Sequence, residues 1–386
     1  MWIFFYIFFI LTSIVILPIA KLNDFWWIPK ECIFNLFGFS FIAATWFGNT
    51  QKSLTFKNLW LGIILIYCVL SFGWYFYIPL IFNNQVGKII WNLWVIRPFI
   101  NIFLGLLIIQ ALVEYTDNLH RWVQISKMLC WVSFGFSVYA ILQYLGIDQI
   151  FNQPNVRFTN DERVITLLGN STLTGNFLAM LSPLCLIFKR LRYKIIYVLC
   201  FFGILVSNSS LSMVAFVIGL LTYLLLMKKY KMSMLIILLG SVFVFIKGIG
   251  FFSFSGRFEI WNNIFIYCKD TIWLGKGLGN FAVNQYRPFA YLKALYSNSA
   301  HCEPLQILHD GGLFMLALVM VYLVDLFRRM FFTKQNILFI GFISAFITYL
   351  IISLGNFPLR IAPLALVGII YIASLEAQII KGEQYG

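Results

Sequence analysis

The sequence is poor in charge and in the residues that usually carry enzyme chemistry. Only 11% of its 386 residues are charged, Asp and Glu together number 14, and there are three histidines. The seven cysteines fall mostly inside apolar stretches and lack the paired spacing of a metal site, so we interpret them as small hydrophobic residues. This composition excludes an ordinary soluble enzyme and a disulfide-rich secreted domain.

The sequence is rich in long hydrophobic segments. Hydrophobic residues make up 61% and aromatic residues 19% of the chain, and the mean hydropathy is +0.87. A helix of about 20 apolar residues crosses a hydrocarbon core of about 30 Å, whereas a membrane β-barrel shows short alternating segments. We therefore predict an all-α, polytopic membrane protein that forms a single integral membrane domain over residues 1–386, with residues 1–20 kept as a span. About twelve transmembrane helices are expected, at residues 1–20, 32–48, 58–80, 88–113, 120–145, 167–187, 192–206, 210–226, 232–247, 305–327, 335–354 and 359–378.

The positions of the lysines and arginines indicate how these spans are oriented in the membrane. With a cytoplasmic N-terminus, the basic clusters fall inside and the outer connections hold few cations, which satisfies the positive-inside rule. Both termini are then cytoplasmic, and the long connection 248–304 lies on the extracytoplasmic face. The net charge of +14 is explained by topology and attraction to anionic membrane lipids, so no nucleic-acid partner is expected. The basic clusters lie near residues 52–57, 121–127, 189–194, 228–231 and 328–334.

The connection 248–304 contains a short amphipathic pattern, "FSFSGRFEIWNNIFIYCKDTIW". Ser255 is a candidate N-cap, and Phe258, Trp261 and Phe265 belong to the apolar face of the predicted helix. Two interpretations stay open: a helix lying in the membrane interface, or a helix whose Arg257 faces a phosphate. A guanidinium binds two oxygens at once, which a lysine cannot do.

The next motif, "LGKGLGNF" at 274–281, is rich in glycine. It matches neither the dinucleotide-binding pattern G-x-G-x-x-G nor the Walker sequence. We predict a tight turn that brings the backbone close to its neighbours.

Two of the three histidines lie in "NSAHCEPLQILHDGG", residues 298–312. Pro304 suits the first turn of a helix, so His301 and Glu303 should lie at the N-terminal mouth of the span that follows. The positive end of the helix dipole favours a neutral imidazole, a credible general base for a sugar hydroxyl. The alternative is a polar cap; a zinc site is disfavoured because no H-E-x-x-H is present. His309 and Asp310 are expected further in, within the membrane.

Three other arginines occur in or beside predicted spans: Arg97, Arg163 and Arg360. Intramembrane cations are usually paired or functional, so each is either part of a structural ion pair or a ligand for a polyanionic head group. Asp161 and Glu162 are possible partners of Arg163.

"SGRFEIW", "LGKGLGNF" and "AHCEPLQILHDGGL", in this order within a many-span chain, resemble the O-antigen ligase and polymerase superfamily. The resemblance covers about residues 160–375. It implies a metal-independent glycosyltransferase without a cofactor, acting at the outer face of the bacterial inner membrane. Such an enzyme transfers a glycan from a polyprenyl diphosphate carrier to an acceptor hydroxyl, on lipid A–core or on a growing glycan, in lipopolysaccharide or surface polysaccharide assembly.

The resemblance also implies roles for individual residues. His301 matches the histidine that activates the acceptor, and Arg257 matches a diphosphate-binding arginine of the same family. Arg163 and Arg360 are further candidates for diphosphate binding. Cys302 replaces the usual Asn or Ser, which leaves any acceptor contact at that position in doubt. Supporting roles are expected for Trp261, Glu303, His309 and Asp310.

Several activities remain open on the sequence. A ligase is favoured slightly over a repeat-unit polymerase by the spacing from His301 to Gly312, and a protein-glycosylating transferase comes third. A flippase or transporter of lipid-linked glycans is the rival from another class; it is disfavoured because the sequence shows no internal repeat.

Overall fold

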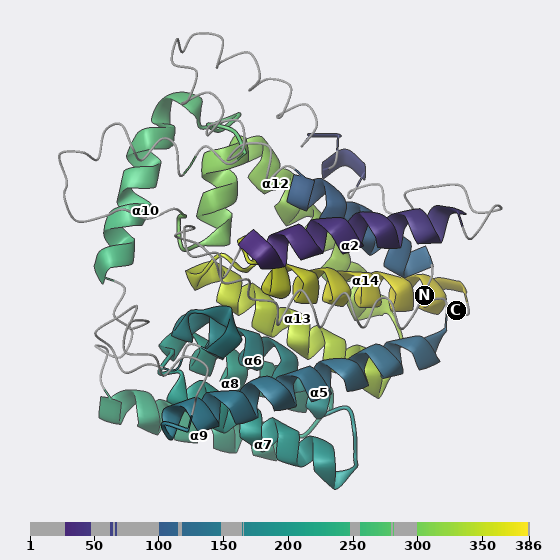
Figure 1. The fold of residues 1–386 in the computed structure, drawn as a ribbon, viewed down its shortest axis with the longest axis vertical. Helices are drawn as coiled ribbons and strands as arrows, with labels where there is room; N and C mark the ends of the chain where they lie inside the picture. Colours follow the sequence, from purple (N-terminus) through teal and green to yellow (C-terminus); the bar gives the residue numbers. More distant parts are fainter. Residues whose placement is uncertain are drawn as a thin grey trace.

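The computed structural model describes residues 28–47, 62–64, 66–67, 100–114, 118–147, 164, 166–247, 255–278, 281 and 299–384, and all regular structure within these ranges is helical. The predicted all-α class is confirmed for this part of the chain (Figure 1). The α-helices are α2 (Ile28–Phe47), an unlabelled helix (Ile100–Glu114), α5 (Leu119–Tyr144), α6 (Ser171–Cys185), α7 (Leu191–Val206), α8 (Ser210–Leu226), α9 (Tyr230–Lys247), α10 (Ser255–Cys268), α12 (Glu303–Phe332), α13 (Ile337–Gly355) and α14 (Ala362–Gln384); the 3-10 turns are η3 (Thr166–Leu168), η5 (Lys269–Thr271) and η7 (Pro358–Arg360).

Four of the described helices are long and apolar enough to cross a membrane, namely α5, α12, α13 and α14. This identifies a membrane protein but does not confirm about twelve spans. The spans predicted at 1–20 and 58–80 fall wholly or mostly outside the described residues, as does the first half of 88–113. The helices α6, α7 and α8 have 15, 16 and 17 residues, fewer than the roughly 20 that a perpendicular span needs.

The core forms where α5, α6, α7, α8 and α13 pack together, and α6 is buried along nearly its whole length. Small residues allow this close packing. A Cβ on Gly175 would lie 2.5 Å from the hydroxyl oxygen of Ser207 and 2.7 Å from that of Ser212. Ser212 also donates a hydrogen bond of 2.8 Å to the side chain of Asn176 on α6. Small and hydroxyl side chains at helix contacts are typical of helices packed within membranes.

Helix α12 is interrupted near its N-terminal end. Gly312 has φ 70° and ψ −172°, so it breaks the helix into a short segment from Glu303 and a longer one that ends at Phe332. The sequence did not predict this break. Figure 1 shows α10 at one edge of the molecule, and α10 packs against α12.

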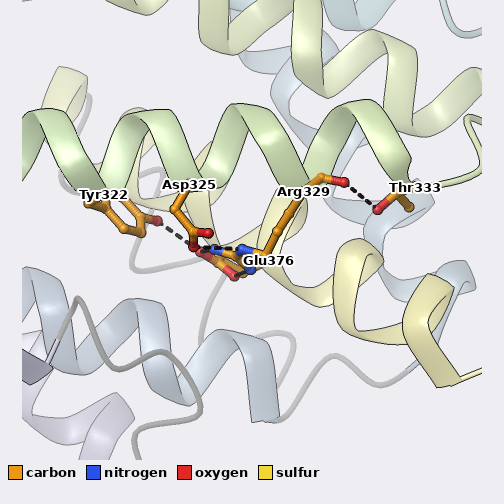
Figure 2. Close-up of polar contacts among 5 residues, drawn as sticks. All are labelled: Tyr322, Asp325, Arg329, Thr333 and Glu376. Atoms are coloured by element: carbon orange, nitrogen blue, oxygen red, sulfur yellow. Dashed lines mark hydrogen bonds and ion pairs between the residues drawn. The ribbon is translucent and has the colours of Figure 1, made fainter.

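Two ion pairs tie α12 to the chain of α14. Near the N-terminal end of α12, Asp310 pairs with Arg360, which lies just before α14. Near the C-terminal end, Arg329 makes two hydrogen bonds, of 2.7 and 2.8 Å, with the buried Glu376 (Figure 2). Tyr322 and Asp325 complete this second cluster: the tyrosine hydroxyl donates to Glu376, and Arg329 Nε donates to Asp325.

No charged residue occurs in the sequence between the two pairs, over 311–324 on α12 and 361–375 on α14. At about 1.5 Å per residue, the unbroken part of α12 from Leu313 to Arg329 rises about 24 Å. This length is somewhat less than the hydrocarbon thickness of about 30 Å.

Candidate functional site

The glycine-rich turn packs directly on the break in α12. Lys276 N–H donates to the carbonyl of His309 at 2.6 Å, and Gly277 N–H donates to that of Asp310 at 2.8 Å. The helix itself cannot satisfy these carbonyls where Gly312 departs from helical geometry. In return, Leu313 N–H donates to the carbonyl of Ile272 at 2.7 Å. The predicted tight turn with close backbone contacts is therefore confirmed.

Glycine is required on both sides of this contact. Gly275 and Gly312 have φ values of 74° and 70°, in the left-handed region. A Cβ on Gly275 would lie 2.5 Å from Gly312 N, and a Cβ on Gly312 would lie 2.3 Å from the carbonyl oxygen of Trp273. Backbone atoms on both sides leave no room for a methyl group.

Helix α10 begins at Ser255, so the serine predicted as its N-cap is instead its first residue. Its buried side consists of Ile260, Ile264 and Cys268, which pack with Phe281 and Ala300. Phe258 and Phe265, predicted on the apolar face of this helix, do not pack on this buried side, because their side chains are 61% and 53% exposed; the interpretation of a helix lying in the membrane interface stays open.

Arg257 lies in the first turn of α10 and reaches the end of α13. Its Nη1 donates a 2.7 Å hydrogen bond to the carbonyl of Gly355. The side chain is half-buried, and burial lowers the pKa of the guanidinium from its ordinary value. An arginine nevertheless keeps its charge in a protein. Trp261, one turn further along, donates from Nε1 to the carbonyl of Ala300 at 3.0 Å and so ties α10 to the residue before His301.

His301 has an unusual backbone and an apolar neighbour. Its φ is 50°, which is uncommon for a residue other than glycine. The imidazole contacts the ring of Phe357 edge to face, with the ring centroids 5.0 Å apart. Burial, and secondly the positive charge of Arg257, lower the pKa of His301 to about 4. The imidazole is therefore neutral at physiological pH.

The start of α12 agrees with the sequence analysis. Cys302 is the N-cap residue, with extended backbone and no hydrogen bond from its side chain to the helix, and Pro304 lies in the first turn. Glu303, the first helical residue, is buried, and its Oε1 accepts a 2.8 Å hydrogen bond from the backbone N–H of Leu359. Glu303 therefore links the mouth of α12 to η7.

Asp310 is the centre of a buried polar group. Its Oδ1 lies 2.8 Å from His309 Nδ1 and accepts a hydrogen bond of 3.2 Å from Gln306 Nε2, and its Oδ2 pairs with Arg360. Gln306 Oε1 accepts from the backbone N–H of Ala300 at 2.8 Å. One donor of Arg360 is thus engaged, whereas its Nε is buried and has no hydrogen-bond partner among the described residues.

The structure brings most of the predicted site residues together around 299–310: Arg257, Trp261, His301, Glu303, His309, Asp310 and Arg360. Arg163 and Arg97 lie outside the described residues, as do Asp161 and Glu162. Among the described residues, no group of three or more His, Cys, Asp or Glu side chains could hold a metal ion.

The sequence singled out Arg360 but not Gln306, nor the contacts of Gly355, Phe357 and Leu359 in the connection between α13 and α14. Gln306 could have been found from its spacing, because it lies four residues before Asp310 on one helix face. Gly355, Phe357 and Leu359 gave no such signal, because two of them contribute backbone groups and the third a phenyl ring.

Comparison with known proteins supports the family resemblance. Residues 195–320 match a family model described as O-antigen ligase. The match includes Arg257, the glycine turn and His301, and it ends before Arg360. A search of curated proteins found no match. Residues 195–320 are therefore similar to the O-antigen ligase family, and the resemblance to the O-antigen ligase and polymerase superfamily is confirmed.

Proposed function

We propose that this chain, whose residues 195–320 are similar to the O-antigen ligase family, is a glycosyltransferase of surface polysaccharide assembly with His301 and Arg257 at its active site. The donor is a glycan on a polyprenyl diphosphate carrier, and the acceptor is a hydroxyl group of lipid A–core. One observation carries this proposal: Arg257 Nη1 donates to the carbonyl of Gly355, and the His301 imidazole packs on Phe357, two residues further along. Burial and the Arg257 charge lower the pKa of His301, so the same short segment contacts a neutral base and a cation.

The reaction divides between these two residues. The neutral imidazole of His301 accepts the proton of the acceptor hydroxyl as the hydroxyl oxygen attacks the anomeric carbon. The bond between that carbon and the carrier's diphosphate oxygen breaks, and the diphosphate leaves with the bonding electrons. Arg257 stabilises the negative charge that develops on it. The imidazolium is then next to a cation, which favours release of its proton.

The remaining arginines are proposed to assist with the diphosphate. Arg360 has one donor engaged with Asp310 and its Nε without a partner, so it retains donors for a phosphate oxygen. Arg163 is proposed on the family resemblance alone. Arginines supply the positive charge in this scheme, and the proposed reaction requires no metal ion.

We place the site on the periplasmic side of the bacterial inner membrane, within the connection 248–304 and the start of α12, with both termini cytoplasmic. The exposed cations of 189–194 and 228–231 support this orientation, as does the basic C-terminal end of α12. The Asp310–Arg360 pair would then lie at the outer boundary of the hydrocarbon core and Arg329–Glu376 at the inner one. Transfer at the outer face needs a donor that is already activated, which a polyprenyl diphosphate glycan is.

The experiment is transfer by purified protein in vesicles that contain the lipid-linked glycan and lipid A–core. Arg257→Ala and His301→Ala should each abolish transfer while the protein still inserts and purifies. Arg192→Ala, at an exposed position on α7, is the matched control and should transfer normally. Near-normal transfer by either site variant would refute the proposed roles.

The same vesicles separate the alternatives. If the glycan grows on its carrier with no lipid A–core present, the protein is a repeat-unit polymerase. If lipid-linked glycan crosses the membrane without a new glycosidic bond, and both site variants still move it, the protein is a flippase.

A further inference from the structure

The connection between α13 and α14 touches every part of the candidate site. Within residues 355–360, hereafter the 355–360 connection, four positions make contacts. The carbonyl of Gly355 accepts from Arg257, the ring of Phe357 packs on His301, the N–H of Leu359 donates to Glu303, and Arg360 pairs with Asp310. Their partners lie on α10 and on 301–310.

These contacts join residues that lie far apart in the sequence. Arg257 and Gly355 are 98 residues apart, and Glu303 and Leu359 are 56 apart. Two features restrict the backbone of the connection: Pro358 fixes one φ, and Asn356 Oδ1 accepts the backbone N–H of Phe357 at 3.0 Å. A rigid segment that holds both functional side chains can set the distance between them.

The side chain of Glu303 accepts a hydrogen bond from Leu359 and so holds the connection near its middle. Glu303 is 4% exposed, and the N–H that it accepts lies between the contact at Phe357 and the ion pair at Arg360. If its acceptor oxygen is removed, the part-buried N–H of Leu359 loses this partner.

We propose that the 355–360 connection is the positioning element of the active site, and that Glu303 is the positioning residue that holds it against His301 and Arg257. The proposal rests on the proposed function. Glu303 itself touches neither donor nor acceptor. It acts through Leu359 and Phe357 on the imidazole, and through Gly355 on the guanidinium.

Two variants of one residue isolate this role. Glu303→Gln keeps an oxygen that can accept from Leu359, so it should retain transfer within about threefold of the unmodified protein. Glu303→Leu has similar volume and no acceptor, and should lower kcat at least tenfold with little change in the KM for the donor. Asp270→Leu, at an exposed carboxylate of η5, is the matched control and should leave kcat unchanged.

A second readout does not depend on transfer. The chain has three histidines, so ring-labelled histidine gives few NMR signals, and His301→Gln identifies the signal of His301. A phenyl ring 5.0 Å away shifts that signal. Glu303→Leu should move the His301 signal and raise its pKa as water reaches the ring, whereas Glu303→Gln and Asp270→Leu should not. Phe357→Leu should reproduce the shift of Glu303→Leu and also lower kcat.

The outcomes are distinct. If Glu303→Leu transfers normally and leaves the His301 signal in place, the positioning role is refuted while the proposed function stands. If no variant transfers glycan but Glu303→Leu moves the His301 signal, the positioning of His301 stands and the proposed function fails. If Glu303→Leu does not fold, Glu303→Gln and Phe357→Leu decide: loss of transfer in Glu303→Gln, or an unchanged His301 signal in Phe357→Leu, refutes the proposal.

Discussion

Arg257 on α10 and His301 before α12 contact residues two apart in the 355–360 connection, Gly355 and Phe357. Burial and the charge of the Arg257 guanidinium lower the pKa of the His301 imidazole. The pair combines a base that is neutral at physiological pH with a cation suited to a diphosphate. Four predictions follow from this arrangement and from the helices that hold it.

The first prediction concerns the pH dependence. Arg257→Gln removes the positive charge that disfavours imidazolium, so the pKa of His301 should rise above its value of about 4. Its NMR titration measures this directly. In the unmodified protein the neutral base is present at neutral pH, and transfer should decline only as the pH falls towards 4. A His301 pKa that falls, or does not move, in Arg257→Gln would contradict the geometry.

The lowered pKa of His301 also makes the stability of the fold depend on pH. The folded state keeps His301 neutral down to about pH 4, whereas its ordinary pKa is 6.5. The unfolded chain therefore binds more protons between these values, and the contribution of His301 to the free energy of unfolding is complete above pH 6.5 and lost as the pH falls towards 4. Between pH 6.5 and pH 4, the melting temperature of His301→Gln should therefore fall less than that of the unmodified protein.

The second prediction concerns Gly312 and Gly275. Each has a left-handed φ and faces backbone atoms, so alanine at either position should break the contact between the glycine turn and α12. Transfer should fall at least tenfold and the melting temperature should fall. Gly135→Ala is the control, because outside the backbone of α5 itself no atom of a described residue lies within 4 Å of a Cβ at this position. Alanine there should be neutral or stabilising by up to about 1 kcal/mol.

The third prediction concerns the ion pair between Arg329 and Glu376 (Figure 2). Arg329→Met removes the arginine partner of the buried Glu376 carboxylate, and breaking a buried ion pair in this way costs about 3–5 kcal/mol. The double variant Arg329→Met, Glu376→Leu removes both charges and should be more stable than Arg329→Met alone. Thermal unfolding in detergent measures both. A double variant that is less stable than either single variant would show that the two side chains do not act as a pair.

The sequence predicted those parts of the site that depend on neighbours along the chain. Pro304 and the apolar run after it located the start of α12, and the glycines of 274–281 indicated a tight turn. Charge and residue type singled out Arg257 and His301. These signals are local, because a cap, a turn or a helix start is specified within a few residues.

The parts that could not be predicted depend on contacts across the fold. The break at Gly312 is stabilised by N–H groups of Lys276 and Gly277, which no pattern in α12 reveals. The exposure of Phe258 and Phe265 follows from the position of the neighbours of α10, because periodicity gives only the spacing of apolar residues. In the 355–360 connection the sequence singled out Arg360, whereas Gly355 and Leu359 act through backbone groups, which have no signature in residue type.

The fourth prediction tests the central claim most directly, because it separates the two proposed roles. The measurement is the affinity of the polyprenyl diphosphate-linked donor for the protein in vesicles, compared with the rate of transfer, for His301→Gln and Arg257→Gln. His301→Gln should bind the donor within about twofold of the unmodified protein while transfer falls at least a hundredfold, and Arg257→Gln should lose both. Normal transfer by His301→Gln, or undiminished donor binding by Arg257→Gln, would contradict the assignment of base and diphosphate ligand.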